Sequence, residues 1–205
     1  MHFSAVWHVT VQSMLRVDVH GLVGQGTSME LMCKGDNYSR RVKCYSSHPT
    51  ETCFLPSDPF QLVPSAYNKI EMVMRPLSVG KKQVVVHCVD LDTKELVAGW
   101  LVTSSSSAPV VSRTYDVDVC VGKSAHKKIA YVNKWERSRQ FRLRTSNPDL
   151  VKVKDPRLSV VGKGKGFIRL WFAPVLRSGT KEMFIFVNDE EDQNEECLLL
   201  RLVAN

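Results

Sequence analysis

The end of the chain decides the fold, and its sequence is Glu182-Met-Phe-Ile-Phe-Val-Asn188-Asp-Glu-Glu-Asp-Gln-Asn-Glu-Glu196-Cys-Leu-Leu-Leu-Arg-Leu-Val203. The apolar run 183–187 is short and rich in Phe, Ile and Val, which favours a buried strand over a helix. The segment 188–196 carries six carboxylates and no apolar side chain, so we expect it to cross the surface as a turn. The stretch therefore predicts a β-hairpin that closes a sheet.

Length and composition place the chain among ordinary globular proteins. It has 205 residues, of which 43% are hydrophobic and 24% are charged, close to the averages for folded domains. This length fits two domains of roughly 100 residues each. No apolar run of about 18 residues is present to span a membrane, and the first residues lack the pattern of a signal peptide. We therefore expect a cytoplasmic protein.

The second half of the chain repeats the first at an offset of about 99 residues. The segment 40–49, RRVKCYSSHP, aligns with 139–148, RQFRLRTSNP. The segment 80–90, GKKQVVVHCVD, aligns with 179–189, GTKEMFIFVND, and each is followed by a polar turn and a final apolar strand. A unit of this length is too large for a solenoid repeat, and it fits an independently folded β-sandwich of roughly seven short strands.

Alternation of apolar and polar residues predicts strands along both halves and no long helix. The small, polar run 103–109 is typical of a linker. We therefore predict an all-β protein made of two tandem immunoglobulin-like antiparallel β-sandwiches, residues 1–106 and 107–205. The predicted strands are 7–12, 15–20, 29–33, 41–45, 60–64, 70–74, 83–89 and 96–102 in the first half, and 115–121, 129–132, 141–144, 158–161, 167–172, 183–187 and 197–203 in the second.

Charge is unevenly distributed along the chain, whose formal net charge is +7. Basic residues gather in the middle and acidic residues in the closing turn. A basic face suits an acidic protein, a phospholipid or a nucleic acid, whereas a solvated surface is the simpler interpretation of the same charges. Trp135 is a candidate exposed anchor for a protein interface. The candidate partner-binding residues are Lys127, Lys128, Trp135, Arg137, Arg139, Arg142, Arg144, Asp189, Glu190, Glu191 and Asp192.

Signatures of catalysis and of metal binding are missing from the sequence. The six cysteines and six histidines show neither C-x-x-C nor H-x-x-x-H spacing. The glycine-rich run 162–166 lacks the frame of a phosphate-binding loop, so we interpret it as a turn. No nucleophile elbow is present, and the acidic turn lacks the glycine and the spacing of a calcium-binding loop. We expect no cofactor, no metal, no enzymatic activity and mostly buried, reduced cysteines.

Six motifs occur in order along nearly the whole chain: Arg16-Val-Asp-Val, Ser47-His-Pro49, Arg75-Pro-Leu77, Val89-Asp-Leu-Asp92 with Leu96-Val-Ala-Gly-Trp-Leu-Val102, Phe172-Ala-Pro174, and Val187-Asn-Asp-Glu-Glu-Asp-Gln-Asn-Glu-Glu196. Together they resemble the C-terminal region of the nephrocystin-4 family. The resemblance implies sandwiches similar to the major-sperm-protein class, in a non-enzymatic scaffold of the ciliary transition zone and basal body. The partners it implies are nephrocystin-1 and the retinitis-pigmentosa-GTPase-regulator-interacting-protein-like protein.

Two functions stay open at this point. The first is a protein–protein interaction scaffold that helps to assemble the gate at the cilium base, as the resemblance implies. The alternative is a basic face in the second domain that binds nucleic acid or anionic lipid, and such binding would weaken steeply with salt. No motif assigns individual residues to a partner. The residues of the alternative basic face are Lys127, Lys128, Arg137, Arg139, Arg142 and Arg144.

Overall fold

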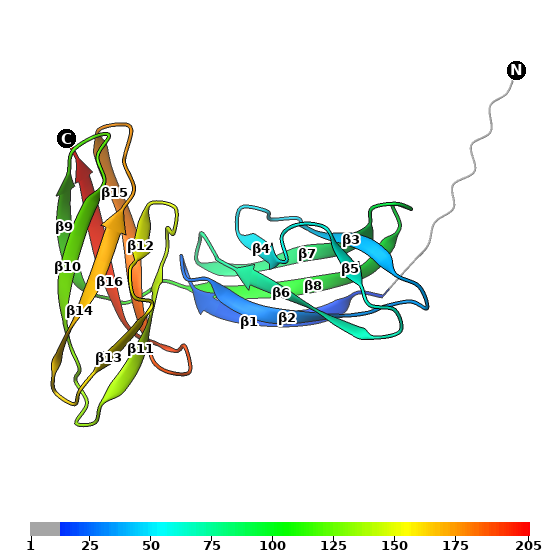
Figure 1. The fold of residues 1–205 in the computed structure, drawn as a ribbon, viewed down its shortest axis with the longest axis horizontal. Helices are drawn as coiled ribbons and strands as arrows, with labels where there is room; N and C mark the ends of the chain where they lie inside the picture. Colours follow the sequence, from blue (N-terminus) through cyan, green and yellow to red (C-terminus); the bar gives the residue numbers. More distant parts are fainter. Residues whose placement is uncertain (1–12) are drawn as a thin grey trace, which may run out of the picture. The chain divides into compact units, whose positions relative to one another are not determined.

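The structure, a computed structural model, describes residues 13–205, which form sixteen β-strands and no helix (Figure 1). The chain divides into two compact units, and each sandwich is described by itself. The all-β class predicted from the sequence is confirmed. The strand predicted over 7–12 lies outside the described residues. Within residues 13–205, no helix has the length and hydropathy needed to cross a membrane.

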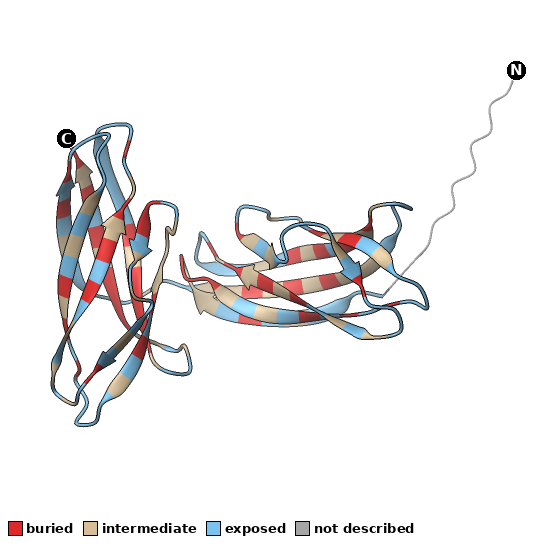
Figure 2. Cartoon of the chain, in the orientation of Figure 1, coloured by how far each residue is buried: buried red, intermediate tan, exposed pale blue. Residues whose placement is uncertain are grey.

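The first sandwich pairs a five-stranded sheet, in the order β1-β8-β7-β3-β5, with a three-stranded sheet, in the order β2-β6-β4. Buried and exposed residues alternate along its strands (Figure 2), because successive side chains of a strand face opposite sides of the sheet. Trp100, which is 1% exposed, is the largest side chain of its core. The strands are β1 (Leu15–Leu22), β2 (Thr27–Lys34), β3 (Arg40–Ser46), β4 (Thr52–Leu55), β5 (Phe60–Leu62), β6 (Tyr67–Met74), β7 (Gly80–Asp90) and β8 (Leu96–Ser107).

The second sandwich has the same plan, with sheets in the orders β13-β11-β15-β16-β9 and β10-β14-β12. Its core includes Phe141 and Tyr131, whose rings pack edge to face with centroids 5.0 Å apart. Burial of such aromatic side chains contributes much of the stability of a small domain. The strands are β9 (Val111–Val119), β10 (Ala125–Val132), β11 (Arg139–Thr145), β12 (Val151–Val153), β13 (Arg157–Val160), β14 (Lys165–Phe172), β15 (Gly179–Asn188) and β16 (Asn194–Ala204).

The two sandwiches match strand for strand. The order β1-β8-β7-β3-β5 corresponds to β9-β16-β15-β11-β13, and β2-β6-β4 corresponds to β10-β14-β12. Inward positions are apolar in both copies, as in Ile70, Met72 and Met74 of β6 and the equivalent run of β14. The internal repeat predicted from the sequence is therefore confirmed.

Three details of the predicted strand pattern are wrong. Among residues 13–205 each sandwich has eight strands rather than roughly seven, because β4 and β12 are not among the predicted strands. The predicted linker 103–109 is largely strand, since β8 continues to Ser107 with Ser104 buried and the Ser106 hydroxyl donating to the carbonyl of Ser78 (2.7 Å). The pairing of β9 with β16 is parallel, unlike the other pairings described for that sheet.

The closing hairpin is confirmed, but its ends differ from the prediction. β15 and β16 pair antiparallel up to Asn188↔Asn194. Asn188 is 0% and Glu196 is 5% exposed, although the whole segment 188–196 is predicted to lie at the surface. The Asn188 amide donates to Asp192 (3.0 Å) and accepts from Asn194 (3.1 Å). These partners satisfy the buried amide, as burial of a polar side chain requires.

Candidate interaction surface

The acidic turn between β15 and β16 is built around Asp189. Its Oδ1 atom accepts hydrogen bonds from the backbone N–H groups of Glu191 (3.0 Å) and Gln193 (2.8 Å). Asp90 in the first copy accepts two backbone N–H groups of its own turn in the same way. An aspartate that accepts such bonds shapes a turn, so the shape of this turn does not depend on its additional acidic residues.

The acidic turn pairs with the basic strand β11 of the same sandwich. Arg144 binds both carboxylate oxygens of Asp192, with Nε 2.9 Å from Oδ1. Arg139 binds Glu195, and its guanidinium lies 4.9 Å from the ring centroid of Trp135. The indole Nε1 of Trp135 also donates to Glu195 (3.2 Å). The acidic residues therefore neutralise part of the basic cluster within the domain.

The first sandwich has an equivalent ion pair beside the turn that joins β7 to β8. Arg40 begins β3 as Arg139 begins β11, and it lies 3.0 Å from Glu95 and 3.0 Å from Asp90. Hydrogen bonds from backbone N–H groups of the turn hold the pKa of Asp90 below its ordinary value, and the Arg40 guanidinium lowers it further. An arginine that closes the hairpin is thus a repeated feature of this domain.

Glu196 is a buried carboxylate that has no counterpart at the equivalent position of the first copy. It accepts a hydrogen bond from the Ser112 hydroxyl (2.8 Å) and lies 3.4 Å from Lys134 Nζ and 3.7 Å from Arg113 Nε. It is the third residue of β16, and Ala98 is the third residue of β8. Because the first copy has alanine at this position, the topology does not require the charge.

The predicted candidate residues do not form one surface. The arginines of β11 belong to the five-stranded sheet of the second sandwich, whereas the lysines of β10 belong to the three-stranded sheet. The sequence therefore identified a cluster that the fold separates. Arg139, Arg142 and Arg144 lie on β11, Lys127 and Lys128 lie on β10, Trp135 and Arg137 lie between these strands, and Asp189, Glu190, Glu191 and Asp192 lie in the turn that contacts β11.

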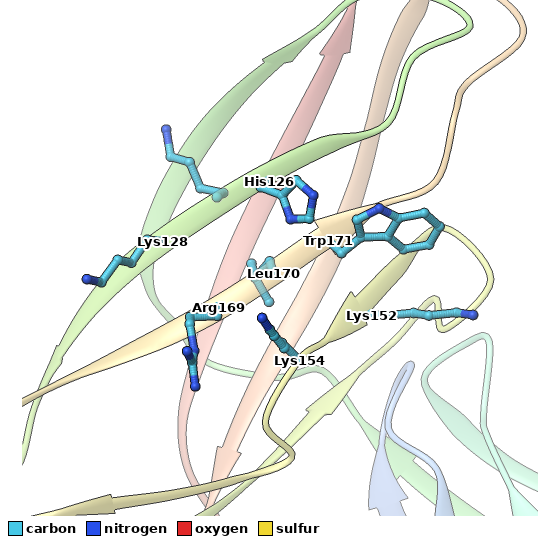
Figure 3. A pocket seen from close by; sticks show the side chains of 8 residues that line it. His126, Lys128, Lys152, Lys154, Arg169, Leu170 and Trp171 are labelled. Carbon is cyan, nitrogen blue, oxygen red and sulfur yellow. The ribbon is translucent and has the colours of Figure 1, made fainter.

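The three-stranded sheet β10-β14-β12 carries a different basic cluster (Figure 3). The strand register brings its members together, because Lys128 pairs with Arg169, and Trp171 lies between His126 of β10 and Lys152 of β12. A pocket of about 520 Å³ lies over these residues. We term it the basic pocket, and its lining residues are His126, Lys127, Lys128, Lys152, Lys154, Arg169, Leu170 and Trp171.

Cations outnumber acids around the basic pocket. Arg169 forms an ion pair with Asp155, at 2.6 Å, and among residues 13–205 the four lining lysines form none. The Lys152 ammonium lies 5.6 Å from the ring centroid of Trp171, and the Lys128 ammonium lies 3.8 Å from that of Phe167. Unpaired positive charges on neighbouring strands repel one another. The pocket therefore attracts anions.

The first sandwich has a pocket at the equivalent place with the opposite charge. This acidic pocket, of about 570 Å³, lies over β2, β6 and β4. Glu30 is the fourth residue of β2, as Lys128 is of β10, and Glu71 is the fifth residue of β6, as Arg169 is of β14. Lys69 lines the acidic pocket too, and it is paired with Glu30 (3.0 Å).

Most of the basic pocket is not predicted from the sequence. Lys127 and Lys128 are among the predicted candidate residues, whereas Lys152, Arg169 and Trp171 are not. One signal was present, since the alternation Lys-x-Phe-x-Arg-x-Trp over 165–171 puts four side chains on one face of a strand. Nothing in the sequence shows that β12 lies beside β14, because that pairing joins separate parts of the chain.

Metal-ligating and thiol groups form no site in the part of the chain that the structure describes. Residues 13–205 contain no cluster of His, Cys, Asp and Glu side chains suited to a metal ion. The cysteines are free, and those at Cys53 and Cys120 are exposed. Burial raises the pKa of the Cys197 thiol to about 12. That thiol is therefore neutral and unreactive near pH 7.

Comparison with protein families matches both halves of the chain. Residues 23–107 match the model described as NPH4 Ig-like domain 3, and residues 112–205 match the model described as NPH4 Ig-like domain 4. These matches confirm the tandem immunoglobulin-like fold predicted from the sequence. They are models of immunoglobulin-like domains and indicate no enzyme family.

Solved structures with a related fold are more distant. A major-sperm-protein family member of C. elegans, WR4, is 12% identical with a TM-score of 0.35, and the alignment covers 45% of this chain and 92% of that one. A PapD-like domain of human CEP192 is 12% identical with a TM-score of 0.33, covering 52% of this chain and 98% of that one. Likenesses at this level say nothing about function.

Full-length relatives agree with the family models. Nephrocystin-4 of Xenopus laevis is 35% identical over 199 residues, and nephrocystin-4 of Homo sapiens is 34% identical over 199 residues. Each alignment covers 96% of this chain, and the chain spans 14% of the length of these relatives. The resemblance predicted from the sequence motifs is thus confirmed. The chain belongs to the nephrocystin-4 family, of which it contains the third and fourth Ig-like domains.

Proposed function

We propose that this tandem module is a protein–protein interaction scaffold that helps to assemble the gate at the cilium base, at the transition zone and basal body. The observation that carries the proposal is the match of both sandwiches to the nephrocystin-4 family. The two pockets add support, because equivalent sheet faces of opposite charge provide one module with two surfaces of different binding preference.

The proposal includes two protein partners, nephrocystin-1 and the retinitis-pigmentosa-GTPase-regulator-interacting-protein-like protein. Its support is the family resemblance of the sequence motifs. The chain acts in the cytoplasm at the cilium base in this proposal. Its two domains, residues 1–106 and 107–205, are the separate binding units.

A pull-down tests the scaffold function. The whole chain is immobilised and incubated with fragments of each proposed partner, and a tandem immunoglobulin-like fragment from an unrelated protein serves as the control. Circular dichroism establishes that the immobilised chain is folded. We expect capture of at least one partner by the chain and not by the control. Failure to capture either partner with a folded chain contradicts the proposal.

The alternative, binding of nucleic acid or anionic lipid through the predicted basic face, has less support. That face would combine Lys127 and Lys128 with the arginines of β11, which lie in a different sheet. Arg139 and Arg144 are already bound to acidic side chains, so binding of an external anion there competes with internal ion pairs. Steeply salt-dependent binding of oligonucleotides or anionic vesicles that is lost in Arg142→Glu would restore this alternative.

A further inference from the structure

The basic pocket of the second sandwich gathers lysines, an arginine and a tryptophan on one sheet. Strand register places a nitrogen-bearing side chain on each side of Trp171, because His126 is its neighbour on β10 and Lys152 is its neighbour on β12. Lys128 and Arg169 are neighbours in the same way. These outward positions belong to neighbouring strands of one sheet, and Figure 3 shows His126, Lys128, Arg169, Trp171 and Lys152 around the pocket.

The charge of the basic pocket selects an anionic ligand. Asp155 offsets one positive charge by pairing with Arg169. The lysines of the lining lack such a partner among the described residues, and repulsion between them is relieved when an anion binds. The acidic pocket of the first copy shows that this cation cluster is not demanded by the fold, since Glu30 and Glu71 occupy the positions of Lys128 and Arg169.

The form of the site favours a peptide over a nucleic acid or a membrane. A pocket of about 520 Å³ can take a bulky side chain, whose apolar contacts would be the Trp171 ring and the aliphatic stems of the lysines. Single-stranded nucleic acid binds by stacking bases on free aromatic faces. Here the Lys128 ammonium lies over Phe167 and the Lys152 ammonium over Trp171. A flat lipid surface would leave the pocket unfilled.

We propose that the basic pocket binds an acidic peptide segment of a partner protein. One bulky apolar side chain of the peptide contacts the edge of the Trp171 ring, and flanking carboxylates pair with Lys128, Lys152 and Lys154. This inference rests on the proposed scaffold function and assigns it a particular surface and a chemical class of partner. Both ion pairs and apolar contacts contribute, so neither acidity nor an aromatic residue in the peptide is sufficient by itself.

Fluorescence anisotropy with defined peptides tests the proposal. The probe is a labelled peptide in which one central phenylalanine is flanked by alternating aspartate and glutamate. One comparison peptide replaces the acids by asparagine and glutamine, and another replaces the phenylalanine by serine. We expect the whole chain to bind the probe, to bind both comparison peptides more weakly, and to lose affinity as salt rises.

Charge-reversal variants locate the site. Lys128→Glu and Lys152→Glu are each expected to lower the affinity for the probe by roughly fivefold or more. Each variant removes an ion pair with the peptide and adds a repulsive charge. Lys181→Glu is the matched control, since it makes the same change of side chain and net charge at an exposed position of β15 in the other sheet. Trp171→Ala tests the apolar contact. Thermal unfolding of each variant checks that the fold is retained.

Each outcome decides the proposal. An equal loss in Lys181→Glu shows non-specific attraction by net charge and overturns it, as does the absence of probe binding to the folded chain. Tighter binding of oligothymidylate or of phosphatidylserine vesicles, with the same dependence on Lys128 and Lys152, reassigns the pocket to those anions and overturns the peptide assignment. If Lys128→Glu and Lys152→Glu capture the partners as efficiently as the unaltered chain does, this inference fails while the scaffold function stands.

Discussion

The three-stranded sheets of the two sandwiches share an architecture and differ in charge. β2 and β10 have the same length and burial pattern at their inward positions, and so do β6 and β14. The outward positions have diverged instead, since they face solvent and do not constrain the fold. The lesson is that inward residues specify the sandwich, while outward residues set what each copy attracts. The equivalent outward pairs are Ser28 and His126, Glu30 and Lys128, Glu71 and Arg169, and Val73 and Trp171.

The largest expected difference between the copies is in how much stability each loses when one core side chain is truncated. Phe141, 0% exposed in β11, corresponds to Val42, 0% exposed in β3. Phe141→Ala leaves a large cavity beside Tyr131 and is expected to lower the free energy of unfolding of the second sandwich by about 3–5 kcal/mol. Val42→Ala removes fewer atoms and should cost the first sandwich about half as much. Urea unfolding measures both, and equal losses would contradict this account of the cores.

The arginine that closes each hairpin is expected to have the next largest effect. The side chain of Arg139 is 13% exposed and binds Glu195, so Arg139→Ala should lower the stability of the second sandwich by about 1–2 kcal/mol. Arg142→Ala, on the same strand and exposed, is the control and should change stability by less than about 0.5 kcal/mol. Calorimetry of the two variants makes the comparison, and similar stabilities would show that the ion pair contributes nothing.

Exchanging the outward charges tests whether they alone distinguish the two pockets. Glu30→Lys with Glu71→Arg converts the acidic pocket of the first sandwich toward the basic one. If the proposed acidic peptide recognises charge at this face, the double variant should gain about tenfold in affinity for the probe, close to 1.4 kcal/mol. The measurement is made with Lys128→Glu present, so that the second sandwich contributes little. No gain in affinity would mean that Trp171, which replaces Val73, is needed as well.

The smallest expected effect is a change of stability with pH at acidic pH. It arises from one aspartate in each hairpin. Burial opposes ionisation of Asp192, but hydrogen bonds from Arg144 and Asn188 outweigh it and lower its pKa. The pKa of Asp90 is also lowered. A carboxyl whose pKa is lower in the folded chain stabilises it fully above the unfolded pKa of about 3.9, and this contribution is lost as pH falls through the folded pKa.

Asp90→Asn and Asp192→Asn therefore should each destabilise their own sandwich near neutral pH, by an amount that shrinks as the pH falls below about 4. Asparagine keeps the size of the side chain and its accepting oxygen, so the shape of the turn is retained. Unfolding measured across this pH range provides the test. A difference between variant and unaltered chain that stays constant with pH would exclude the titration of these groups as the cause.

Most of the fold could be predicted from the sequence, because burial of alternate side chains leaves a local pattern. The apolar run 183–187 and the polar segment after it predicted the closing hairpin, and the repeat predicted two sandwiches of one design. β4 and β12 were missed, although the equally short β5 and β13 were predicted from the apolar runs 60–64 and 158–161. The ends of the acidic turn were misplaced because Asn188 and Glu196 are buried with polar partners, which a hydropathy pattern does not reveal.

The sequence by itself determined the class of fold, its duplication and its family, since these depend on local alternation and on order along the chain. Only the tertiary structure decided which charges act together. It bound Arg139 and Arg144 of the predicted basic cluster to the acidic turn, and it brought Lys152 of β12 beside Trp171 of β14. Charges interact through space over a few ångströms, and the register between distant strands sets those separations.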